Sequence, residues 1–410
     1  MEEAVTNFCD GPLTGLRVLD LSRILAGPSA TQLLGDLGAD VIKIERPGKG
    51  DDTRGWGPPF VQDAEGKDTR ESAYYLCANR NKRSVAVDMA NPAGAALLAD
   101  IAASSDVVVE NFKLGDLKRR GLDYETLSAR NPALVYCSIT GFGQTGPYAP
   151  RAGYDFLIQG MGGIMSVTGD ADGQPTKVGV GVADVMTGMY AAVSILSALR
   201  VRDATGQGQH IDLALFDTQI SWLVNQGLDY LTAGTTPVRR GNAHPTVVPY
   251  ETFPASDGWF IIAIGNDGQF AKFAEVAGRP DLAADERFAT NPVRVRNYAA
   301  LIEAMREITR ARPMAEWMTS LAAVSVPCGP VNTIPEAIDD PHARGRGSRV
   351  KQAHPLAGKG YVETLGNPVK LSATPVTYRR PPPMVGEHTE EVLTELGFEP
   401  AALRKAGALG

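Results

Sequence analysis

One carboxylate, Asp184, stands where a glycine-rich run gives way to a long apolar segment. The sequence there reads KVGVGVADVMTGMYAAVSILSALRV, residues 177–201. The apolar segment predicts a buried helix with the aspartate at its N-terminus. As an isolated feature, the aspartate is typical of a helix cap, an anion stabilised by the helix dipole. Alternatively it is a covalent nucleophile, because neighbouring glycines admit a ligand and their N–H groups bind an oxyanion.

Basic residues gather near the ends of predicted strands. The segment NRNKRS (79–84) precedes one strand, and KLGDLKRRGL (113–122) follows another. Asn111 and Phe112 come directly after the strand VVVE, and ligands of open parallel sheets bind beyond the carboxyl ends of strands. Each basic cluster alone is typical of a solvated surface. Together, in a chain of net charge −7, they favour a pocket for an anionic ligand.

The first strand–helix connection is not that of a dinucleotide-binding fold. The loop SRILAGPSA (22–30) has one of the three glycines of the nucleotide fingerprint. The second strand ends in IERPG, where Arg46 suits a phosphate better than a ribose diol. A phosphate-bearing ligand other than NAD is therefore expected.

These residues need a framework of strands and helices to position them. Strand patterns lie at 17–21, 40–45, 83–89, 106–112, 134–143 and from 210, and helix patterns lie between them at 28–38, 92–105 and 124–132. Such alternation predicts an α/β fold with a parallel sheet covered on both faces.

The pattern changes after about Gly241. Two strands flank an SDG turn at 256–258, and two amphipathic helices follow within 297–324. We therefore expect a smaller α+β domain at 225–325. The larger domain would comprise 1–224 and 326–410.

Composition excludes several classes of protein. The negative charge disfavours nucleic acid and anionic membranes as partners. The first residues, MEEAVTNFCDGPL, lack the apolar core of a signal peptide, and no apolar run is expected to span a bilayer. The four cysteines (Cys9, Cys77, Cys137, Cys328) and the five histidines show no metal-ligand spacing. A cytoplasmic protein with reduced thiols and no metal is expected.

At this point many blocks resemble the family III CoA-transferases, the CaiB/BaiF group that includes formyl-CoA and carnitine CoA-transferases. The resemblance covers about 15–396 and is carried by LDLSRILAGPSATQLLGDLGADVIKIERPGKGDDTRGWGPPF, NKRSVAVDM, VVVENF, SITGFGQTGPY, GYDFLIQGMGGIMSVTGD, VADVMTGMYAAVSILSAL, TGQGQHIDLALFD, PCGPVNT and GEHTEEVL. It implies a Rossmann-like large domain built from both ends of the chain, a small central domain, and an interlocked homodimer.

The resemblance also implies a mechanism. Asp184 falls on the family's catalytic aspartate, which forms an aspartyl–acyl anhydride and then an aspartyl-CoA thioester. Coenzyme A and acyl-CoA are then substrates, and no cofactor is bound permanently.

Further site residues follow from the same resemblance. Arg46, Lys82 and Arg119 would serve the phosphates or the adenosine end of CoA. The CoA groove would be lined by Ile24, Leu25, Ala26, Asn111 and Phe112. Gly265 and Gly268 would belong to a loop that closes over the aspartate, although the run GNDGQF has fewer glycines than formyl-CoA transferases. Leu25 replaces a polar residue of that subgroup, which disfavours oxalate or formyl specificity.

The racemase branch of the same superfamily is the main alternative. It pairs a histidine and an aspartate for proton transfer, but here the corresponding motif reads GYD, with Tyr154 and Asp155. A tyrosine with a pKa near 10 is a poor base at neutral pH, so Tyr154 is expected to line the site near the acyl group, or else to be a buried structural residue. A nucleotide-binding module without catalysis is a third reading.

The acids exchanged are predicted only as a class. RRGNAHPTVVPYETF and GNDGQF look like the branch that uses succinyl-CoA and small dicarboxylates such as glutarate, malate, malonate or mesaconate. Arg239, Arg240 or His244 would pair with a distal carboxylate, or be ordinary loop residues.

Overall fold

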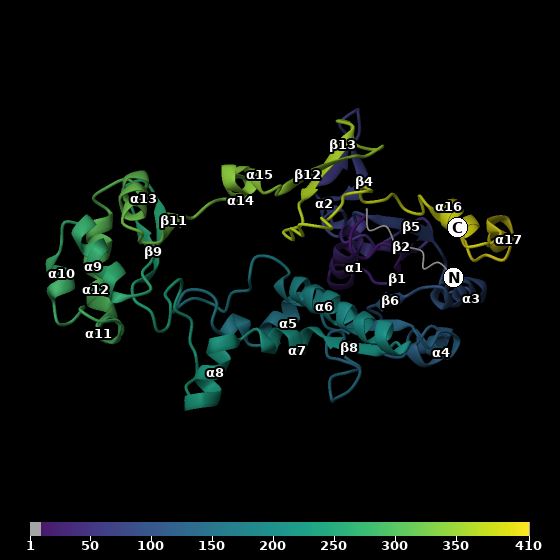
Figure 1. Ribbon diagram of the computed structural model, residues 1–410, viewed down its shortest axis with the longest axis horizontal. Helices are drawn as coiled ribbons and strands as arrows, with labels where there is room; N and C mark the ends of the chain where they lie inside the picture. The colour runs from purple at the N-terminus through teal and green to yellow at the C-terminus, as the bar shows by residue number, and fades with distance from the viewer. Residues whose placement is uncertain (1–9, 410) are drawn as a thin grey trace. The chain divides into compact units, whose positions relative to one another are not determined.

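The computed structural model describes residues 10–409, and these divide into two compact units (Figure 1). The first unit runs up to Gly163 and also contains Val178–Asn225 and the chain from Pro341 onward. The second unit consists of Ile164–Lys177 and Gln226–Asp340.

A six-stranded sheet forms the centre of the first unit. Its strand order is β5-β2-β1-β6-β7-β8, and every neighbouring pair is parallel. The strands are β1 (Arg17–Asp20), β2 (Asp40–Glu45), β5 (Lys82–Ala86), β6 (Val107–Glu110), β7 (Val135–Thr140) and β8 (His210–Ala214). The prediction of an α/β fold with a parallel sheet is confirmed.

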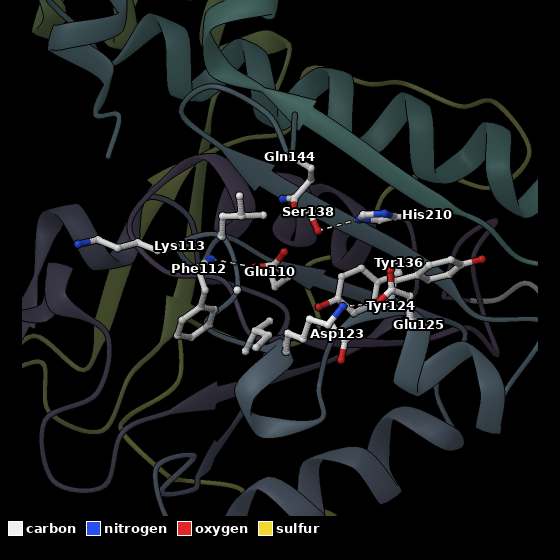
Figure 2. A pocket seen from close by; sticks show the side chains of 14 residues that line it. Glu110, Phe112, Lys113, Asp123, Tyr124, Glu125, Tyr136, Ser138, Gln144 and His210 are labelled. Atoms are coloured by element: carbon white, nitrogen blue, oxygen red, sulfur yellow. Dashed lines mark hydrogen bonds and ion pairs between the residues drawn. The ribbon is translucent and has the colours of Figure 1, made fainter. Parts of the chain in front are cut away.

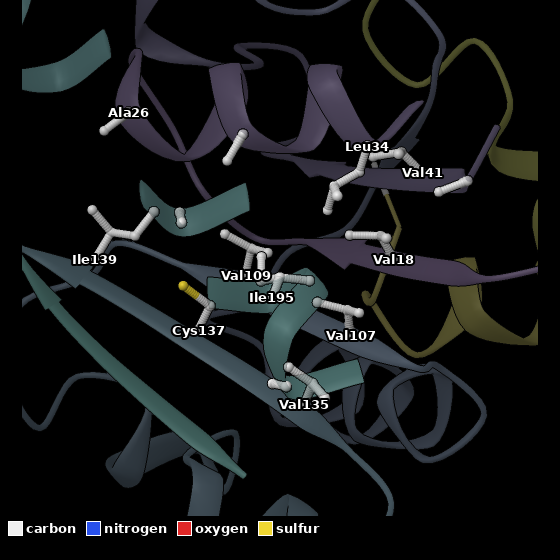
Figure 3. Close-up of a cluster of buried hydrophobic side chains, with 14 of the residues drawn as sticks. Val18, Ala26, Leu34, Val41, Val107, Val109, Val135, Cys137, Ile139 and Ile195 are labelled. Atoms are coloured by element: carbon white, nitrogen blue, oxygen red, sulfur yellow. The ribbon is translucent and has the colours of Figure 1, made fainter. Parts of the chain in front are cut away.

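Successive strand residues point to opposite faces, so each face has its own core. On one face Val18 and Val107 pack with residues of α1 (Ala26–Asp36) and α6 (Val182–Thr205), as Figure 3 shows. On the other face Leu19 and Val108 pack with residues of α3 (Pro92–Ala103), α4 (Tyr124–Arg130) and α16 (Thr389–Glu395). The expected two-sided cover of the sheet is therefore present.

Helix α6 lies unusually close to α1 because it carries a glycine at the contact. A Cβ built on Gly188 would meet the carbonyl oxygen of Ala26 at 2.7 Å. The close approach brings the N-terminus of α6, with Asp184, next to the loop that precedes α1. Gly181, just before α6, likewise faces Leu25, whose Cδ2 lies 3.2 Å from a Cβ built there.

The same helix corrects one expectation from the sequence. Among residues 10–409, α6 is the one helix whose length and apolar composition would allow it to cross a membrane. The sequence analysis had predicted no apolar run of that length. One face of the helix serves the core, since Ala191, Ile195 and Ala198 are buried against the sheet, while Val193 and Leu196 on another face are exposed.

The NRNKRS segment is structural. Arg80 forms a buried ion pair with Asp36 at 2.6 Å, and Arg83 pairs with Glu395 of α16 at 2.6 Å. Arg80 also donates to the carbonyl oxygen of Leu365. These bonds attach the C-terminal part of the chain to the sheet, so the segment is neither the solvated surface nor the anion pocket that the sequence offered as alternatives.

The second unit has its own antiparallel sheet of β9 (Tyr250–Pro254), β10 (Trp259–Ala263) and β11 (Cys328–Pro330). The predicted hairpin is present, with Phe253 opposite Phe260. Helices α9 (Asp267–Val276), α12 (Tyr298–Thr309) and α13 (Met314–Ala323) enclose its core around the fully buried Trp317.

The compact units differ from the expected domains at two places. Strand β11 pairs with β10, so the second unit continues past residue 325 to Asp340. The loop 164–177 also belongs to it, because Arg239 donates to the carbonyl oxygens of Asp170 and Gly173.

The remaining elements are short. They are β3 (Phe60–Gln62), β4 (Asp68–Ser72), α2 (Ala73–Leu76), α5 (Asp155–Met161), α7 (Leu215–Ser221), α8 (Val224–Ala233), α10 (Asp281–Ala284), α11 (Asn291–Arg296), α14 (Ile334–Asp339), α15 (Pro341–Gly345), β12 (Arg349–Ala353), β13 (Tyr361–Leu365) and α17 (Pro400–Lys405), with single 3-10 turns at Asp52–Gly55, Lys118–Arg120 and Ile164–Ser166. Cys77, Cys137 and Cys328 are free thiols, and Cys9 lies outside the described residues.

Candidate active site

A cavity of about 340 Å³ in the first unit is lined by Asp184 and by several other residues that the sequence singled out. It opens at the carboxyl ends of β1, β6 and β7, where ligands of parallel sheets bind. The predicted site residues that line it are Ile24, Leu25, Ala26, Asn111, Phe112, Tyr154 and Asp184. Segments far apart in the sequence thus meet around one carboxylate.

Asp184 does not cap its helix. The N-cap position of α6 is Gly181, and the carboxylate of Asp155 accepts a hydrogen bond from the backbone N–H of Ala183 at 2.8 Å. The N–H of Asp184 itself faces the same Asp155 oxygen at 3.4 Å. The reading of Asp184 as the helix cap is therefore wrong, because a side chain from α5 takes that role and leaves the Asp184 carboxylate available to the cavity.

The protonation of Asp184 is displaced from that of an ordinary aspartate. Burial of the carboxylate, together with the nearby negative charge of Asp155, raises the pKa of Asp184 to about 7. The first turn of a helix favours an anion, so burial and Asp155 outweigh that contribution. An anion that is poorly solvated is a stronger nucleophile than one in water.

The two residues of the GYD motif have different surroundings. Tyr154 is 67% exposed, so it lines the cavity and is not the buried structural residue that was the alternative. Asp155 is engaged by the α6 N-terminus and by the side-chain amide of Gln159 at 2.8 Å. Its carboxylate is thus occupied by structural hydrogen bonds.

Tyr74 is a neighbour of Asp184 that the sequence analysis did not single out. Burial and the negative charge of Asp184 raise the pKa of Tyr74 to about 12, which places its hydroxyl in the electrostatic field of that carboxylate. Its ring packs edge-on against Trp56, with centroids 5.1 Å apart. Only its proximity to Asp184 in space distinguishes it, so no sequence signal marked it.

The loop before α1 is held in an unusual conformation. Ile24 has φ of 72°, a left-handed conformation that a β-branched residue rarely adopts. The side chain of Asn111 fixes the preceding residue, because its oxygen accepts from the N–H of Arg23 at 2.9 Å and its amide donates to the Arg23 carbonyl at 2.6 Å. Asn111, which directly follows β6, therefore holds the backbone next to the strained residue Ile24 by two hydrogen bonds.

A second hollow of about 150 Å³ adjoins the cavity, since Arg23 and Phe112 line both. The guanidinium of Arg23 lies 5.0 Å from the centre of the Phe112 ring. Arg46 and Arg120 bring positive charge to this hollow. Arg119, one of the three residues expected at the phosphates or the adenosine end of CoA, does not line this hollow; its side chain is 68% exposed and pairs with Asp116.

Lys82, expected at the phosphates or the adenosine end of CoA, lies inside the protein in this structure. The Lys82 side chain is fully buried, and its ammonium group bonds to Asp20 at 3.1 Å, to the carbonyl oxygen of Pro28 at 2.9 Å and to Asn79 at 3.0 Å. All three of its donors are used inside the protein. Desolvation lowers the pKa of Lys82 to about 8, against the opposing charge of Asp20.

Three predicted site residues belong to the second unit. Gly265 and Gly268 flank Asn266, whose side chain caps α9 by accepting from the N–H of Gln269. His244 accepts hydrogen bonds at Nδ1 from the N–H groups of Thr246 and Val247, which orders its own turn. Since they lie in another unit from Asp184, their part in the site stays a prediction.

Arg151 is a second residue that the sequence analysis missed. It lines the cavity with Asp184, and its guanidinium lies 4.6 Å from the ring centre of Tyr148 and 5.3 Å from that of Phe142. It pairs with aromatic rings rather than with a carboxylate in the described chain. Its charge is therefore available to an anionic ligand.

A parallel α/β sheet with a poorly solvated carboxylate and several cations at its carboxyl edge has the groups that an enzyme of the group-transfer class requires for an anionic substrate. A family model described as CoA-transferase family III matches residues 13–389. The chain belongs to this family and is a CoA-transferase, as the resemblance in the sequence predicted.

Relatives of known name agree. The chain is 49% identical over 386 residues to a succinate–glutarate CoA-transferase of Agrobacterium fabrum, covering 94% of this chain and 96% of that one. It is 40% identical over 385 residues to the succinyl-CoA:glutarate CoA-transferase of Homo sapiens, covering 94% and 86%. Among solved structures, a CaiB/BaiF family protein from Brucella suis matches with a TM-score of 0.84 and 50% identity, over 94% of this chain and 100% of that one.

Proposed function

We propose that this enzyme transfers CoA from succinyl-CoA to a small dicarboxylate such as glutarate, with Asp184 as the covalent nucleophile. The observation that carries the proposal is the position of the Asp184 carboxylate. It is poorly solvated, it does not cap its own helix, and it lines the same cavity as Ile24, Asn111 and Phe112. The relatives described above support the choice of acids, because their names contain succinate or succinyl-CoA and glutarate.

The proposed reaction has four steps and needs no other reagent. The Asp184 carboxylate attacks the thioester carbonyl, the carbon–sulfur bond breaks, and CoA leaves as a thiolate. The thiolate attacks the aspartyl carbonyl of the mixed anhydride, which releases succinate and leaves an aspartyl-CoA thioester. The acceptor carboxylate attacks that thioester and again releases the thiolate. Attack of the thiolate on the new acyl group yields the product and frees Asp184.

CoA would lie across the two adjoining hollows. The thioester end would face Asp184, and the N-terminus of α1 at Leu25 and Ala26 would present backbone N–H groups to an anionic portion of the ligand. Arg46 and Arg120 in the adjoining hollow would meet the phosphates. We assign the phosphate role to these two arginines in place of Lys82 and Arg119.

Arg151 would bind the distal carboxylate of the dicarboxylate. It lies in the same cavity as Asp184 and Tyr154, whereas Arg239 is held by carbonyl oxygens of its own unit. A planar guanidinium on an aromatic surface suits a carboxylate, which it can hold by two hydrogen bonds. Arg240 and His244 remain candidates from the second unit.

Gly265 and Gly268 are proposed to close over Asp184 in the assembled enzyme. Neither has a positive φ, and a Cβ built on either would meet only ordinary contacts, at 3.6 Å and 3.4 Å. Their own unit therefore does not require glycine at these positions. A close approach by substrate or by another part of the protein would explain the choice.

The enzyme is proposed to be an interlocked homodimer. Helix α6 exposes Val185, Met189, Val193 and Leu196, which recur at the spacing of one helix face. Such a face is typical of a surface covered by a partner. Light scattering should give twice the 43.6 kDa mass of the chain, and a monomer would contradict this part of the proposal.

The test of the function is an acceptor screen. Purified protein is mixed with succinyl-CoA and a panel of mono- and dicarboxylic acids, new CoA esters are identified by mass spectrometry, and hydroxylamine is used to trap an acyl group on Asp184. Asp184→Asn should lose transfer by about a thousandfold or more. Asp203→Asn is the matched control, because Asp203 lies on the same helix at its exposed end.

Two results would overturn the proposal. Transfer by Asp184→Asn at the wild-type rate would exclude the nucleophile. Absence of exchange with every acid, with solvent deuterium entering the α-carbon of a branched acyl-CoA, would identify a racemase instead. Tyr154, at the position where the racemase branch has a histidine, argues against that alternative, since a tyrosine is a poor base at neutral pH.

A further inference from the structure

A second cavity, of about 310 Å³, lies behind the segment that forms the CoA groove. Figure 2 shows the buried Glu110 at the end of β6, with Ser138 and His210 beyond it. Phe112 and Lys113 line both this cavity and the one that holds Asp184. The proposed transfer reaction uses none of Glu110, Ser138 and His210.

Glu110 is placed by the register of the sheet. It lies directly opposite Ser138 on β7, and its side chain is only 5% exposed. One carboxyl oxygen accepts a hydrogen bond from the backbone N–H of Phe112 at 2.8 Å. The Ser138 hydroxyl, which acts to lower the pKa of Glu110, bonds at 2.9 Å to Nε2 of His210.

The bond to Phe112 acts on the CoA groove. Phe112 lies under the guanidinium of Arg23, and its neighbour Asn111 holds both the N–H and the carbonyl oxygen of Arg23. Arg23 in turn precedes Ile24, which stands in its left-handed conformation in the cavity. A single buried carboxyl group thus fixes the turn from which these contacts originate.

We propose that Glu110 is a positioning residue for CoA binding: by accepting from the Phe112 N–H, it fixes Asn111 and Phe112 in the orientation that shapes the groove. The inference rests on the proposed location of CoA, but not on the chemistry at Asp184. A hydrophobic residue of similar size would fill the same space without the acceptor. The buried N–H would then lack a partner and the turn would be free to rearrange.

The Ser138–His210 pair lines the same cavity as this carboxyl group. His210 is exposed and stacks on Tyr124, with ring centres 5.1 Å apart. Burial raises the pKa of Glu110 to about 7, and Asp116 adds to the rise. The other charged groups that line the cavity are Lys113, Lys118, Asp123 and Glu125. Since a carboxylate is a stronger acceptor than the neutral acid, CoA should bind more weakly as the pH falls below about 7.

The test measures the dissociation constant of CoA by calorimetry in the Asp184→Asn background, which removes titration of the nucleophile. Glu110→Ala should weaken binding about tenfold or more, since a hydrogen bond to a charged acceptor is lost. Glu110→Gln keeps an oxygen for the Phe112 N–H and should bind within about threefold of its parent at low pH. Glu125→Gln is the matched control, because Glu125 lines the same cavity at its exposed rim.

The pH dependence separates positioning from a merely structural role. The parent and Glu125→Gln should lose affinity below about pH 7, whereas Glu110→Gln should lose less; titration of the CoA phosphate is common to all three. Equal affinity of Glu110→Ala and its parent would overturn the inference, as would equal pH profiles for Glu110→Gln and Glu125→Gln. If Glu110→Ala fails to fold, the profile of Glu110→Gln decides. Because CoA binding is measured directly, failure of the transferase assay would leave this result intact.

Discussion

The carboxylate of Asp155 caps the helix that carries Asp184. It accepts from the N–H of Ala183 at 2.8 Å and faces the N–H of Asp184 at 3.4 Å. Asp155 therefore satisfies the helix N-terminus and also places a negative charge beside the proposed nucleophile. Two carboxyl groups with different surroundings take different roles, one structural and one reactive.

The pH dependence of catalysis should follow Asp184. Its pKa is about 7, raised by burial and by Asp155, and only the ionised carboxylate attacks a thioester. We expect kcat/KM for succinyl-CoA to increase with pH, to reach half its maximum near pH 7, and to be constant above about pH 8. Initial rates across this range would measure it.

Asp155→Asn provides the comparison. Asparagine still caps the helix, but it carries no charge, so the midpoint should move to lower pH. An unchanged midpoint would show that Asp155 does not act on Asp184.

The nucleophile should reduce the stability of the folded protein. A carboxyl group whose folded pKa is raised contributes stability below its unfolded pKa of 3.8, and this contribution is lost as the pH rises through about 7. Asp184→Asn should therefore be more stable than the wild type at about pH 8, by at most about 4 kcal/mol, since each pKa unit corresponds to about 1.4 kcal/mol. Urea unfolding at several pH values would measure the difference. A gain that persists unchanged at acidic pH would contradict this origin.

Lys82 and Arg46 should respond in opposite ways to substitution. Lys82→Met leaves Asp20 without its buried partner, which should lower the free energy of unfolding by about 3 kcal/mol or more while the KM for succinyl-CoA stays within about twofold. Arg46 is half exposed, so Arg46→Gln should raise KM several-fold, about threefold to tenfold, with little change in stability. Denaturation curves and steady-state kinetics test both. A large rise in KM for a stable Lys82→Met variant would restore the phosphate-binding role.

Gly188 should control the position of Asp184. The methyl group of Gly188→Ala would lie 2.7 Å from the carbonyl oxygen of Ala26, so α6 must move away from α1. We expect a loss of about 1–3 kcal/mol in stability and a lower kcat, because Asp184 is one turn from the contact. Gly345→Ala is the control, since Gly345 has open space around it in α15. Wild-type kinetics of Gly188→Ala would show that the helix contact is not needed.

Much of the framework could be predicted from local sequence. The alternation of β-branched runs with amphipathic segments is a property of neighbouring residues, so it identified the parallel sheet and the Phe253–Phe260 hairpin. The position of Asp184 at a helix start is likewise local. The pairing of β11 with β10 was not predicted, because a strand of three residues that follows one proline and ends in another carries no strand pattern of its own.

The sequence by itself determined the family, the strand and helix order, and the identity of the one carboxylate at the start of α6. The tertiary structure decided which charges are buried in ion pairs and which line a cavity. Lys82 and Arg46 are both basic residues in predicted strand-end segments. Lys82 forms a buried ion pair with Asp20, whereas Arg46 lines a hollow. Asp184 and Asp155 both lie at the starts of helices, but only the Asp155 carboxylate accepts hydrogen bonds from backbone N–H groups. The burial of a charged side chain and its partners depend on segments that are distant in the chain. Burial and partners, rather than residue type, determine the free energy of the ionised form.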